Sequence, residues 1–417
     1  MTWLHWFSAH GFGWNALLAF SLALIWLSRL VAAARGMPTL AEISRPEWDL
    51  PALDANGHSP RVSIVVCALN EEGKIEPALR SLLELDYPDY EVVAVDDRST
   101  DRTGEIMDRI AEEYRAKNAH LSEMHGDSAQ HHELRVVHVT ELPAGWLGKV
   151  HAMWSATNVA NGDWILFTDA DVVYRKDTLR RAIAYAEKDR ADHVVLFPTM
   201  LMYTWSERMM IAFFQAMFVF GHRPWKTADP KSKDHMGVGA FNLVRRSTYE
   251  KIGTYSRMRL SVVDDMKLGE LVKKGGFAQR NIFGRDLIQL HWASGAFGVV
   301  NGLTKNFFAI LRYNPFLALG AMTFMVLFNL TPFLGVVLAH GWARAGYALA
   351  VLSIAGIYYG MADRSNIPPY YVLLHPISST LFAYAVARST IVTMAQGGIT
   401  WRGTKYSLSE LRKGVDV

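Results

Sequence analysis

Cysteine is almost absent from this chain, because Cys67 is the only one among 417 residues. A single cysteine excludes an intramolecular disulfide and any zinc site built from several cysteines. Since Cys67 lies inside a run of β-branched residues, we expect a small buried side chain and not a nucleophile. An excess of one charge is missing too: 43 basic residues nearly balance 40 acidic ones, for a net charge of +3. So small an excess argues against nucleic acid as a partner.

Two sequence signatures are also missing. No Gly-x-Gly-x-x-Gly follows the first predicted strand, which argues against a dinucleotide cofactor. Residues 1–13 contain no Lys or Arg, so they lack the basic start of a secretory signal peptide. The apolar run from Trp14 to Leu27, which extends to Ala34, is therefore predicted to be a transmembrane helix and not a cleaved leader.

Long apolar runs return near the other end of the chain, over residues 316–339, 345–361 and 371–395. We expect transmembrane helices, although His375 and Arg388 interrupt the last run and leave open whether it spans, lies at the interface or is re-entrant. Basic residues after the first helix place the following domain in the cytoplasm. Four spans would then put the basic tail outside, against the same rule. Either one segment does not cross or the rule fails here.

Between the apolar runs, short β-branched segments alternate with amphipathic ones. Strands are predicted at 62–67, 91–95, 135–139 and 164–168, with helices at 75–85, 103–114 and 149–160. This alternation predicts a mostly parallel sheet with helices on both faces. In such sheets ligands bind beyond the carboxyl ends of the strands.

The fourth predicted strand runs into Asp169-Ala170-Asp171. Alternation along a strand would point both carboxylates to one side, where they could hold Mg²⁺ or Mn²⁺ together with substrate phosphates. A solvated turn without a function is the alternative for such a triplet. A cation bound to a diphosphate indicates nucleotide-sugar chemistry.

Polar residues also follow the first two predicted strands: Asn70 and Glu71 after one, Asp96 and Asp97 after the other. A carboxylate can accept from a uracil N3–H or a ribose hydroxyl, and an amide can both donate and accept. We therefore expect these side chains to bind the nucleoside of a donor. The nearby Asp101 has an alternative role as the cap of the following helix.

Together these residues resemble glycosyltransferase family 2, the inverting enzymes with a GT-A fold. The resemblance spans roughly residues 60–295 and is carried by Asn70-Glu71, Val95-Asp96-Asp97-x-Ser99-x-Asp101-x-Thr103 and Asp169-x-Asp171. It implies an α/β fold of the GT-A type, Rossmann-like, with a mostly parallel sheet flanked by helices. One N-terminal and two to three C-terminal transmembrane helices would accompany that domain.

Three further motifs resemble the membrane-attached, non-processive branch of the family. They are Gly145-Trp146-x-Gly148-Lys149, Val262-Val263-Asp264-Asp265 and Trp401-Arg402-Gly403-Thr404-x-Tyr406. Hopanoid-biosynthesis-associated, carotenoid and ceramide glycosyltransferases are the branches that these motifs resemble most.

The resemblance implies a general base. An inverting enzyme must take the proton of an acceptor hydroxyl, and family members use the second residue of a Glu-Asp pair. The pair here is Asp264-Asp265, so Asp265 is the expected base, and Asp in place of Glu at 264 leaves open whether that residue touches the acceptor. Two adjacent carboxylates could also raise one pKa towards the working range. The alternative is a pair of exposed acidic residues that begin a helix.

Cations complete the expected donor site. Lys149 is expected to neutralise a diphosphate or to meet the donor sugar, with a solvated lysine as the alternative. Lys305, in a basic segment next to the membrane, is expected to contact the donor. His291 is a candidate metal ligand beside Asp169 and Asp171, with Mg²⁺ or Mn²⁺ as the cofactor.

Residues 200–225 are crowded with Met, Phe and Trp. A buried core helix is the default explanation, but aromatic and basic residues at both ends are typical of an interfacial helix. We favour the interfacial helix, which would lay the mouth of the site on the cytoplasmic leaflet, within reach of a lipid acceptor.

The expected domains follow in order: a transmembrane helix in 1–35, a linker in 36–60, a cytoplasmic GT-A domain in 61–295, a basic membrane-proximal segment in 296–315, transmembrane helices in 316–395 and a tail in 396–417. The expected activity, at a bacterial inner membrane, is inverting transfer of one hexose or N-acetylhexosamine from a nucleotide diphosphate sugar, most simply a UDP-sugar, to a membrane lipid. A processive polysaccharide synthase is disfavoured because Gln-x-x-Arg-Trp is absent. Two further alternatives are a non-catalytic membrane protein that binds sugar nucleotides and an enzyme for soluble acceptors that is merely anchored in the membrane.

Overall fold

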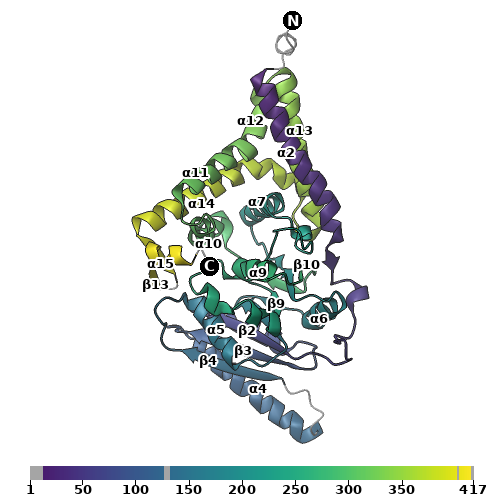
Figure 1. Cartoon of the computed structure of the whole chain (residues 1–417), viewed down its shortest axis with the longest axis vertical. Helices are drawn as coiled ribbons and strands as arrows, with labels where there is room; N and C mark the ends of the chain where they lie inside the picture. The colour runs from purple at the N-terminus through teal and green to yellow at the C-terminus, as the bar shows by residue number, and fades with distance from the viewer. Residues whose placement is uncertain (1–12, 126–131, 402, 415–417) are drawn as a thin grey trace. The chain divides into compact units, whose positions relative to one another are not determined.

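The computed structural model of the chain describes residues 13–125, 132–401 and 403–414 (Figure 1). The chain forms two compact units. The first, here the sheet unit, comprises Leu40–Leu201, Pro224–His291 and Thr400–Val417, and the second, here the helical unit, comprises Met1–Thr39, Met202–Arg223 and Trp292–Ile399. Arg402, part of a motif noted above, lies outside the described residues.

An eight-stranded sheet forms the core of the sheet unit, in the order β1-β10-β7-β9-β5-β2-β3-β4. All its neighbours are parallel except β9, which runs antiparallel to both β5 and β7. The strands are β1 Ala41–Glu42, β2 Val62–Ala68, β3 Tyr90–Asp97, β4 Glu133–Val139, β5 Trp164–Asp169, β7 His193–Phe197, β9 Asn242–Arg245 and β10 Gln279–Phe283. The prediction of a mostly parallel sheet flanked by helices is confirmed.

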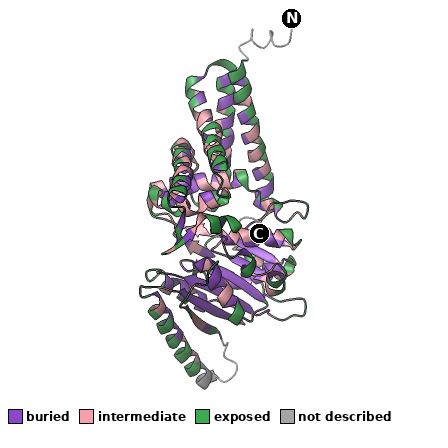
Figure 2. Ribbon diagram, turned by 60° about the vertical axis from the view of Figure 1, so that its left-hand side comes forward, coloured by how far each residue is buried: buried purple, intermediate pink, exposed green. Residues whose placement is uncertain are grey.

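The central strands are apolar without alternation because helices cover both faces of the sheet. Every residue of β2 and β3 is buried, and Figure 2 shows the strands in the colour of buried residues. The flanking helices are α3 Ile75–Leu83, α4 Thr103–His125, α5 Gly148–Val159, α6 Thr178–Lys188, α8 Arg246–Lys251 and α9 Asp264–Lys274. The three helices expected from the sequence are present, and α4 continues beyond its predicted end at residue 114.

A second sheet lies in the same unit, in the order β6-β11-β8. Its strands are β6 Val173–Tyr174, β8 Thr199–Met200 and β11 Ile288–Leu290. After the helical unit the chain continues through β12 Gly398–Trp401, β13 Thr404–Ser407 and α15 Leu408–Lys413.

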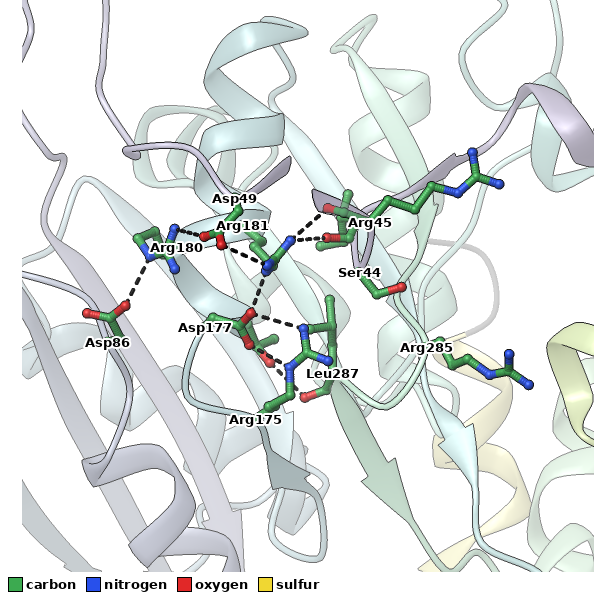
Figure 3. A network of polar contacts seen from close by, with 12 residues as sticks. Ser44, Arg45, Asp49, Asp86, Arg175, Asp177, Arg180, Arg181, Arg285 and Leu287 are labelled. Carbon is green, nitrogen blue, oxygen red and sulfur yellow. Dashed lines mark hydrogen bonds and ion pairs between the residues drawn. The ribbon is translucent and has the colours of Figure 1, made fainter. Parts of the chain in front are cut away.

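Residues 41–49, within the expected linker, are held on the sheet unit (Figure 3). β1 extends the sheet by pairing with β10. Arg181 of α6 donates to the backbone carbonyls of Ile43 and Arg45 at 3.1 and 2.8 Å, and its Nε donates to Asp177 Oδ2. Arg180 donates to Asp49 Oδ1 at 2.6 Å. Hydrogen bonds from the buried Arg181 and the partly exposed Arg180 therefore fix this segment.

We expect Arg181→Met to destabilise the protein by about 3 kcal/mol, because it leaves Asp177 and two carbonyls without a buried donor. The measurement is the thermal midpoint of the purified full-length protein in detergent. Arg175→Met is the matched control: Arg175 also donates to Asp177, but its side chain is 41% exposed against 7% for Arg181. An exposed pair contributes up to about 1 kcal/mol. Equal midpoints for the two variants would contradict this account.

The helical unit contains three helices that are long and apolar enough to cross a membrane: Trp14–Thr39, Pro315–Leu338 and Gly341–Ser365. One is N-terminal and two are C-terminal, as expected. The helices of this unit are α2 Trp14–Gly36, α7 Trp205–Gly221, α10 Gly295–Ile310, α11 Pro315–Phe324, the π-helical turn η6 Met325–Leu330, α12 Thr331–Leu338, α13 Gly341–Ser365 and α14 His375–Ala395. The run at 371–395 is thus largely helical, but α14 is not among the described helices that are long and apolar enough to cross a membrane.

Small side chains allow α2 and α13 to approach closely. A methyl group on Gly346 of α13 would lie 2.8 Å from the Ala19 side chain. Tyr347 donates to Asn15 Oδ1 at 2.7 Å, which adds a polar contact between the two helices. Close packing of small residues is how helices associate where the hydrophobic effect is weak.

Chain continuity restricts which helices can cross. The segments before Trp292 and after Ile399 belong to one folded unit, so they lie on the same side of any membrane. The number of crossings between them is therefore even. Crossings by Pro315–Leu338 and Gly341–Ser365 satisfy this condition, and a third by α14 would violate it. The conflict raised by four spans disappears if α14 does not cross.

Helix α7 begins with a capping box, in which Thr204 and Glu207 satisfy each other's backbone N–H groups. Met210 and Phe213 are fully buried, whereas Trp205 is 63% exposed. One face of α7 is therefore buried, and an aromatic side chain at the start of the helix is exposed. Placement of this helix at a membrane surface stays a prediction.

Candidate functional site

The ammonium group of Lys149 joins two motifs that are far apart in the sequence. Lys149 is the second residue of α5, and its Nζ lies 2.8 Å from Asp169 Oδ1 and 3.6 Å from Asp264 Oδ1. Its side chain is only 12% exposed. The solvated lysine considered as an alternative is thus excluded in this structure.

The Asp264-Asp265 pair begins α9 and is largely enclosed. Asp264 is 4% exposed, and its Oδ2 accepts from the Tyr255 hydroxyl at 3.4 Å. Asp265 Oδ2 accepts from the backbone N–H of Gly239 at 2.9 Å. Two freely exposed acidic residues at a helix start are therefore not what the structure contains.

Glycine residues bring a loop close to both carboxylate motifs. A methyl group on Gly239 would lie 2.4 Å from Asp169 Oδ2. A methyl group on Gly237 would lie 1.8 Å from the backbone oxygen of Asp265, so no side chain fits at that position. The loop between η4 Pro224–Lys226 and β9 thus packs between the end of β5 and the start of α9.

A buried network of hydrogen bonds contacts the backbone at the start of α9. His193 is fully buried, with its Nε2 2.6 Å from Asn242 Oδ1 and its Nδ1 2.8 Å from Gln279 Nε2. Asn242 Nδ2 in turn donates to the backbone oxygen of Asp265 at 3.4 Å. Burial lowers the pKa of His193 to about 4, so this histidine is neutral at physiological pH. The network therefore serves to orient Asp265 without adding charge.

The charges of this cluster contribute to raising two pKa values. The rise stabilises the charged form of Lys149 and the neutral form of Asp265. Burial and the Asp264 carboxylate raise the pKa of Asp265 to about 6, against the opposing effect of Lys149. Burial by itself would lower the pKa of Lys149, but Asp169, Asp264 and Asp265 outweigh it and raise that pKa. Lys149 therefore stays cationic, and the pKa of Asp265 lies above the ordinary aspartate range.

The first aspartate pair is engaged by the protein itself. Asp97 is fully buried. It accepts hydrogen bonds from Arg98 Nε and Nη2 at 2.8 and 3.1 Å. Asp96 Oδ1 accepts from the Ser99 N–H, and its Oδ2 lies 3.1 Å from His138 Nδ1. A carboxylate has about four acceptor positions, but the Asp97 side chain is fully buried, so of the two only Asp96, 13% exposed, is open to a ligand in this structure.

The residues after β2 are tied to the loop after β3. Asn70 Oδ1 accepts from the Thr100 N–H at 2.8 Å, and the Glu71 N–H donates to Thr103 Oγ1 at 2.8 Å. Asp101 Oδ1 accepts from the Thr103 N–H at the start of α4, as expected of a helix cap. The four residues expected at the nucleoside thus lie at the adjacent carboxyl ends of β2 and β3.

The residues of the Asp169-x-Asp171 motif lie at a strand end and in a turn. β5 ends at Asp169, so strand alternation does not extend to Asp171. Asp171 Oδ2 accepts from Lys74 Nζ at 3.1 Å, while Asp169 holds Lys149. Within the described residues no group of three or more His, Cys, Asp or Glu is arranged to hold a metal.

Two carboxylates nevertheless fit a divalent cation that is completed by substrate. Mg²⁺ is usually held by one or two carboxylates together with phosphate oxygens and waters. Gly239 adds no side chain next to Asp169 Oδ2, where a methyl group would lie only 2.4 Å away. His291 follows β11 in the sheet unit, whereas Lys305 lies in α10 of the helical unit. Their expected roles stay predictions.

Sequence reasoning missed residues that complete the charge pattern. They are Arg98 on Asp97, His138 on Asp96 and Lys74 on Asp171. Burial lowers the pKa of His138, but hydrogen bonds to Asp108 and Asp96 outweigh it and raise that pKa. For His138 the signal was the pairing of two predicted strands, because the register of β3 and β4 puts Asp96 directly beside His138.

We expect opposite changes in the pKa of Asp265 from two single substitutions. Asp264→Asn removes a repelling charge and should lower that pKa towards the ordinary aspartate range, whereas Lys149→Gln removes an attracting charge and should raise it above about 6. The measurement is a carboxyl titration by infrared or ¹³C spectroscopy of aspartate-labelled protein. Glu105→Gln, an exposed site, is the control and should leave the titration unchanged. Shifts of the same sign would refute this description.

Comparisons with known proteins agree with the fold. Residues 63–253 match the family model described as "Glycosyl transferase family 2". This chain is 23% identical over 398 residues to the 4,4'-diaponeurosporenoate glycosyltransferase of Staphylococcus aureus (strain bovine RF122 / ET3-1). The match covers 92% of this chain and 99% of the relative. The protein of the same name from strain USA300 matches with the same identity and coverage.

Among solved structures, a mannosyltransferase from Pyrobaculum calidifontis in complex with GDP-Man and Mn²⁺ superposes with a TM-score of 0.51. It is 21% identical, and the match covers 90% of this chain and 99% of that one. At this identity the likeness concerns the fold. This chain therefore carries a glycosyltransferase family 2 domain with the GT-A fold.

Proposed function

We propose that this protein transfers a single sugar, with inversion, from a nucleotide diphosphate sugar to a membrane lipid. The observation that carries the proposal is Asp265, a largely enclosed carboxylate whose pKa is raised to about 6 and whose neighbour Asp264 shares the Lys149 ammonium group with Asp169. A general base works best when its pKa lies near the operating pH. The raised pKa makes Asp265 a stronger base than an ordinary aspartate.

In the proposed reaction, an acceptor hydroxyl oxygen attacks the anomeric carbon from the face opposite the diphosphate. A new carbon–oxygen bond forms as the bond from that carbon to the phosphate oxygen breaks, and the electron pair leaves with the nucleoside diphosphate. Asp265 takes the proton of the hydroxyl. A single displacement of this kind inverts the anomeric centre.

Negative charge grows on the departing diphosphate, and its neutralisation is the main electrostatic demand of the step. Lys149 is suited to this role because it is cationic, largely desolvated and fixed at the start of α5. Asp169 and Asp171 would hold a divalent cation, which would supply further neutralisation on the diphosphate. Mn²⁺ is present in the complex of the Pyrobaculum calidifontis mannosyltransferase, which supports Mg²⁺ or Mn²⁺ here.

The nucleoside would bind at the carboxyl ends of β2 and β3. Asn70, Glu71, Asp96 and Asp97 lie there, with Arg98 and His138 neutralising the two aspartates. Partial neutralisation makes a carboxylate a hydrogen-bond acceptor that does not repel the diphosphate. UDP remains the expected nucleotide, and the GDP of the mannosyltransferase complex is the first alternative to test.

The acceptor is proposed to be a lipid. Helices that could cross a membrane belong to the same chain, and the Staphylococcus aureus relatives are named for a carotenoid acid, diaponeurosporenoate. We place the sheet unit on the cytoplasmic side, where nucleotide sugars are made, and the exposed Trp205 at the start of α7 in contact with the lipid surface. A hydroxyl acceptor is favoured over a carboxylate, because a carboxylate is already deprotonated and needs no base.

We expect the detergent-solubilised protein to form a glycolipid from a UDP-sugar or GDP-sugar and total membrane lipid, with Mn²⁺ and not with EDTA. Asp265→Asn should lower kcat by about 10²- to 10⁴-fold, the usual contribution of a general base, with donor binding retained. Glu105→Gln, the exposed control, should have the activity of the wild type. Donor binding without any product, from every donor tested, would contradict the proposal and favour a non-catalytic role.

The pH dependence of kcat/KM should distinguish the two kinds of acceptor. For a hydroxyl acceptor the base must be deprotonated, so the rate should fall about tenfold per pH unit below the Asp265 pKa of about 6. Asp264→Asn should move this acid limb to lower pH. For a carboxylate acceptor the limb should instead follow the carboxyl pKa of the lipid, and Asp265→Asn should change kcat little.

A further inference from the structure

Residues 403–414 belong to the sheet unit, although the helical unit precedes them in the sequence. β13 leads into α15 through a capping box between Ser407 and Glu410. Leu411 is fully buried, and a methyl group on Gly414 would lie 2.7 Å from the Leu260 side chain. This segment, Thr404–Gly414, is therefore packed and not a free tail.

Tyr406 reaches the start of the helix that carries Lys149. It is 6% exposed, and its hydroxyl oxygen accepts from the backbone N–H of Gly148 at 3.1 Å. The first N–H groups of a helix have no partner within the helix. Leu147, the N-cap of α5, offers no side-chain cap, so Tyr406 supplies one of the missing acceptors.

The same short segment reaches the first aspartate pair. Thr404 Oγ1 accepts from Arg98 Nη1 at 3.4 Å, while the other nitrogens of Arg98 hold Asp97. Arg98 has a φ of +64°, a conformation that costs a non-glycine residue free energy and persists only when its surroundings hold it. Thr404 therefore accepts a hydrogen bond from the one guanidinium nitrogen of Arg98, Nη1, that does not bond to Asp97.

Gly148 brings these two contacts together. A methyl group there would lie 2.6 Å from Asp97 Oδ2 and 2.5 Å from Arg98 Nη2. The start of α5 thus packs directly against the Arg98–Asp97 pair, and one phenol and one hydroxyl from β13 bond to the two sides of that contact. Lys149 is the next residue of the helix.

We propose that Tyr406 and Thr404 are positioning residues of the donor site. They fix the start of α5 and the Arg98–Asp97 pair relative to each other, and so fix the distance between the nucleoside end and the diphosphate end of that site. This inference rests on the proposed function, because it assigns the donor to those two places. It makes the site incomplete without residues that follow the membrane helices in the sequence.

The test compares Tyr406→Phe with Lys405→Gln in the full-length protein. Lys405 is the exposed neighbour of Tyr406 on β13, so its substitution controls for disturbance of the strand. Loss of one hydrogen bond should raise the donor KM about 3- to 10-fold for Tyr406→Phe. The acceptor KM, the kcat and the thermal midpoint should stay close to those of the wild type, as should all values for Lys405→Gln.

Thr404 provides a second and independent variant. Thr404→Val should raise the donor KM, and Thr404→Ser, which keeps the hydroxyl, should restore the wild-type value. A donor KM unchanged in both Tyr406→Phe and Thr404→Val would overturn the inference. So would an equal rise in the acceptor KM, since that would indicate a general structural defect.

Calorimetric binding of UDP and GDP separates this inference from the proposed function. If the wild type transfers no sugar but binds a nucleoside diphosphate, the proposed function fails, and a weaker affinity of Tyr406→Phe still supports the positioning role. Equal affinities of the wild type and Tyr406→Phe would refute that role. No binding of either nucleotide to the wild type would refute both.

Discussion

The interaction on which the site depends is the contact of one buried ammonium group with two carboxylates. Lys149 lies between Asp169 at the end of β5 and Asp264 at the start of α9. Without that cation, several carboxylates would repel one another in an environment that water does not screen, and burial of unpaired charge is costly. The pair of Asp264 and Asp265 is tolerated because this cation lies beside it.

The scaffold places these charges with little freedom. β2, β3 and β5 are parallel, so the loops after them open at one edge, and the antiparallel β9 brings Asn242 under α9. The neutral His193 network then holds the backbone of Asp265. Buried, hydrogen-bonded supports hold a side chain or backbone group in one geometry, and His193, Asn242 and Gln279 are both buried and hydrogen-bonded.

The path of the chain gives the architecture a constraint that a soluble domain lacks. The sheet unit is interrupted twice by the helical unit and completed by residues after the last apolar helix. An even number of crossings is therefore needed before the chain can return, which two of the candidate helices provide. The final segment then reaches Gly148 and Arg98, so the same path that sets the topology also completes the site.

Local patterns in the sequence were sufficient for the elements of the fold. The strand-forming runs of β2 to β5, the apolar helices and the aspartates near strand ends could be predicted because period, length and chain polarity are local properties. The strand order, with β9 inserted between β5 and β7, could not, because it depends on pairings between distant segments.

The site divides in the same way. The residue types at 96, 97, 149, 169, 264 and 265 and their expected chemistry followed from the sequence and its family resemblance. The contact of Lys149 with Asp264, the arginine on Asp97 and the phenol on Gly148 arise only when the chain folds. The physical reason is that charge and hydrogen-bond partners are set by distances in space, and only the tertiary structure brings residues so far apart in the chain within a few ångströms.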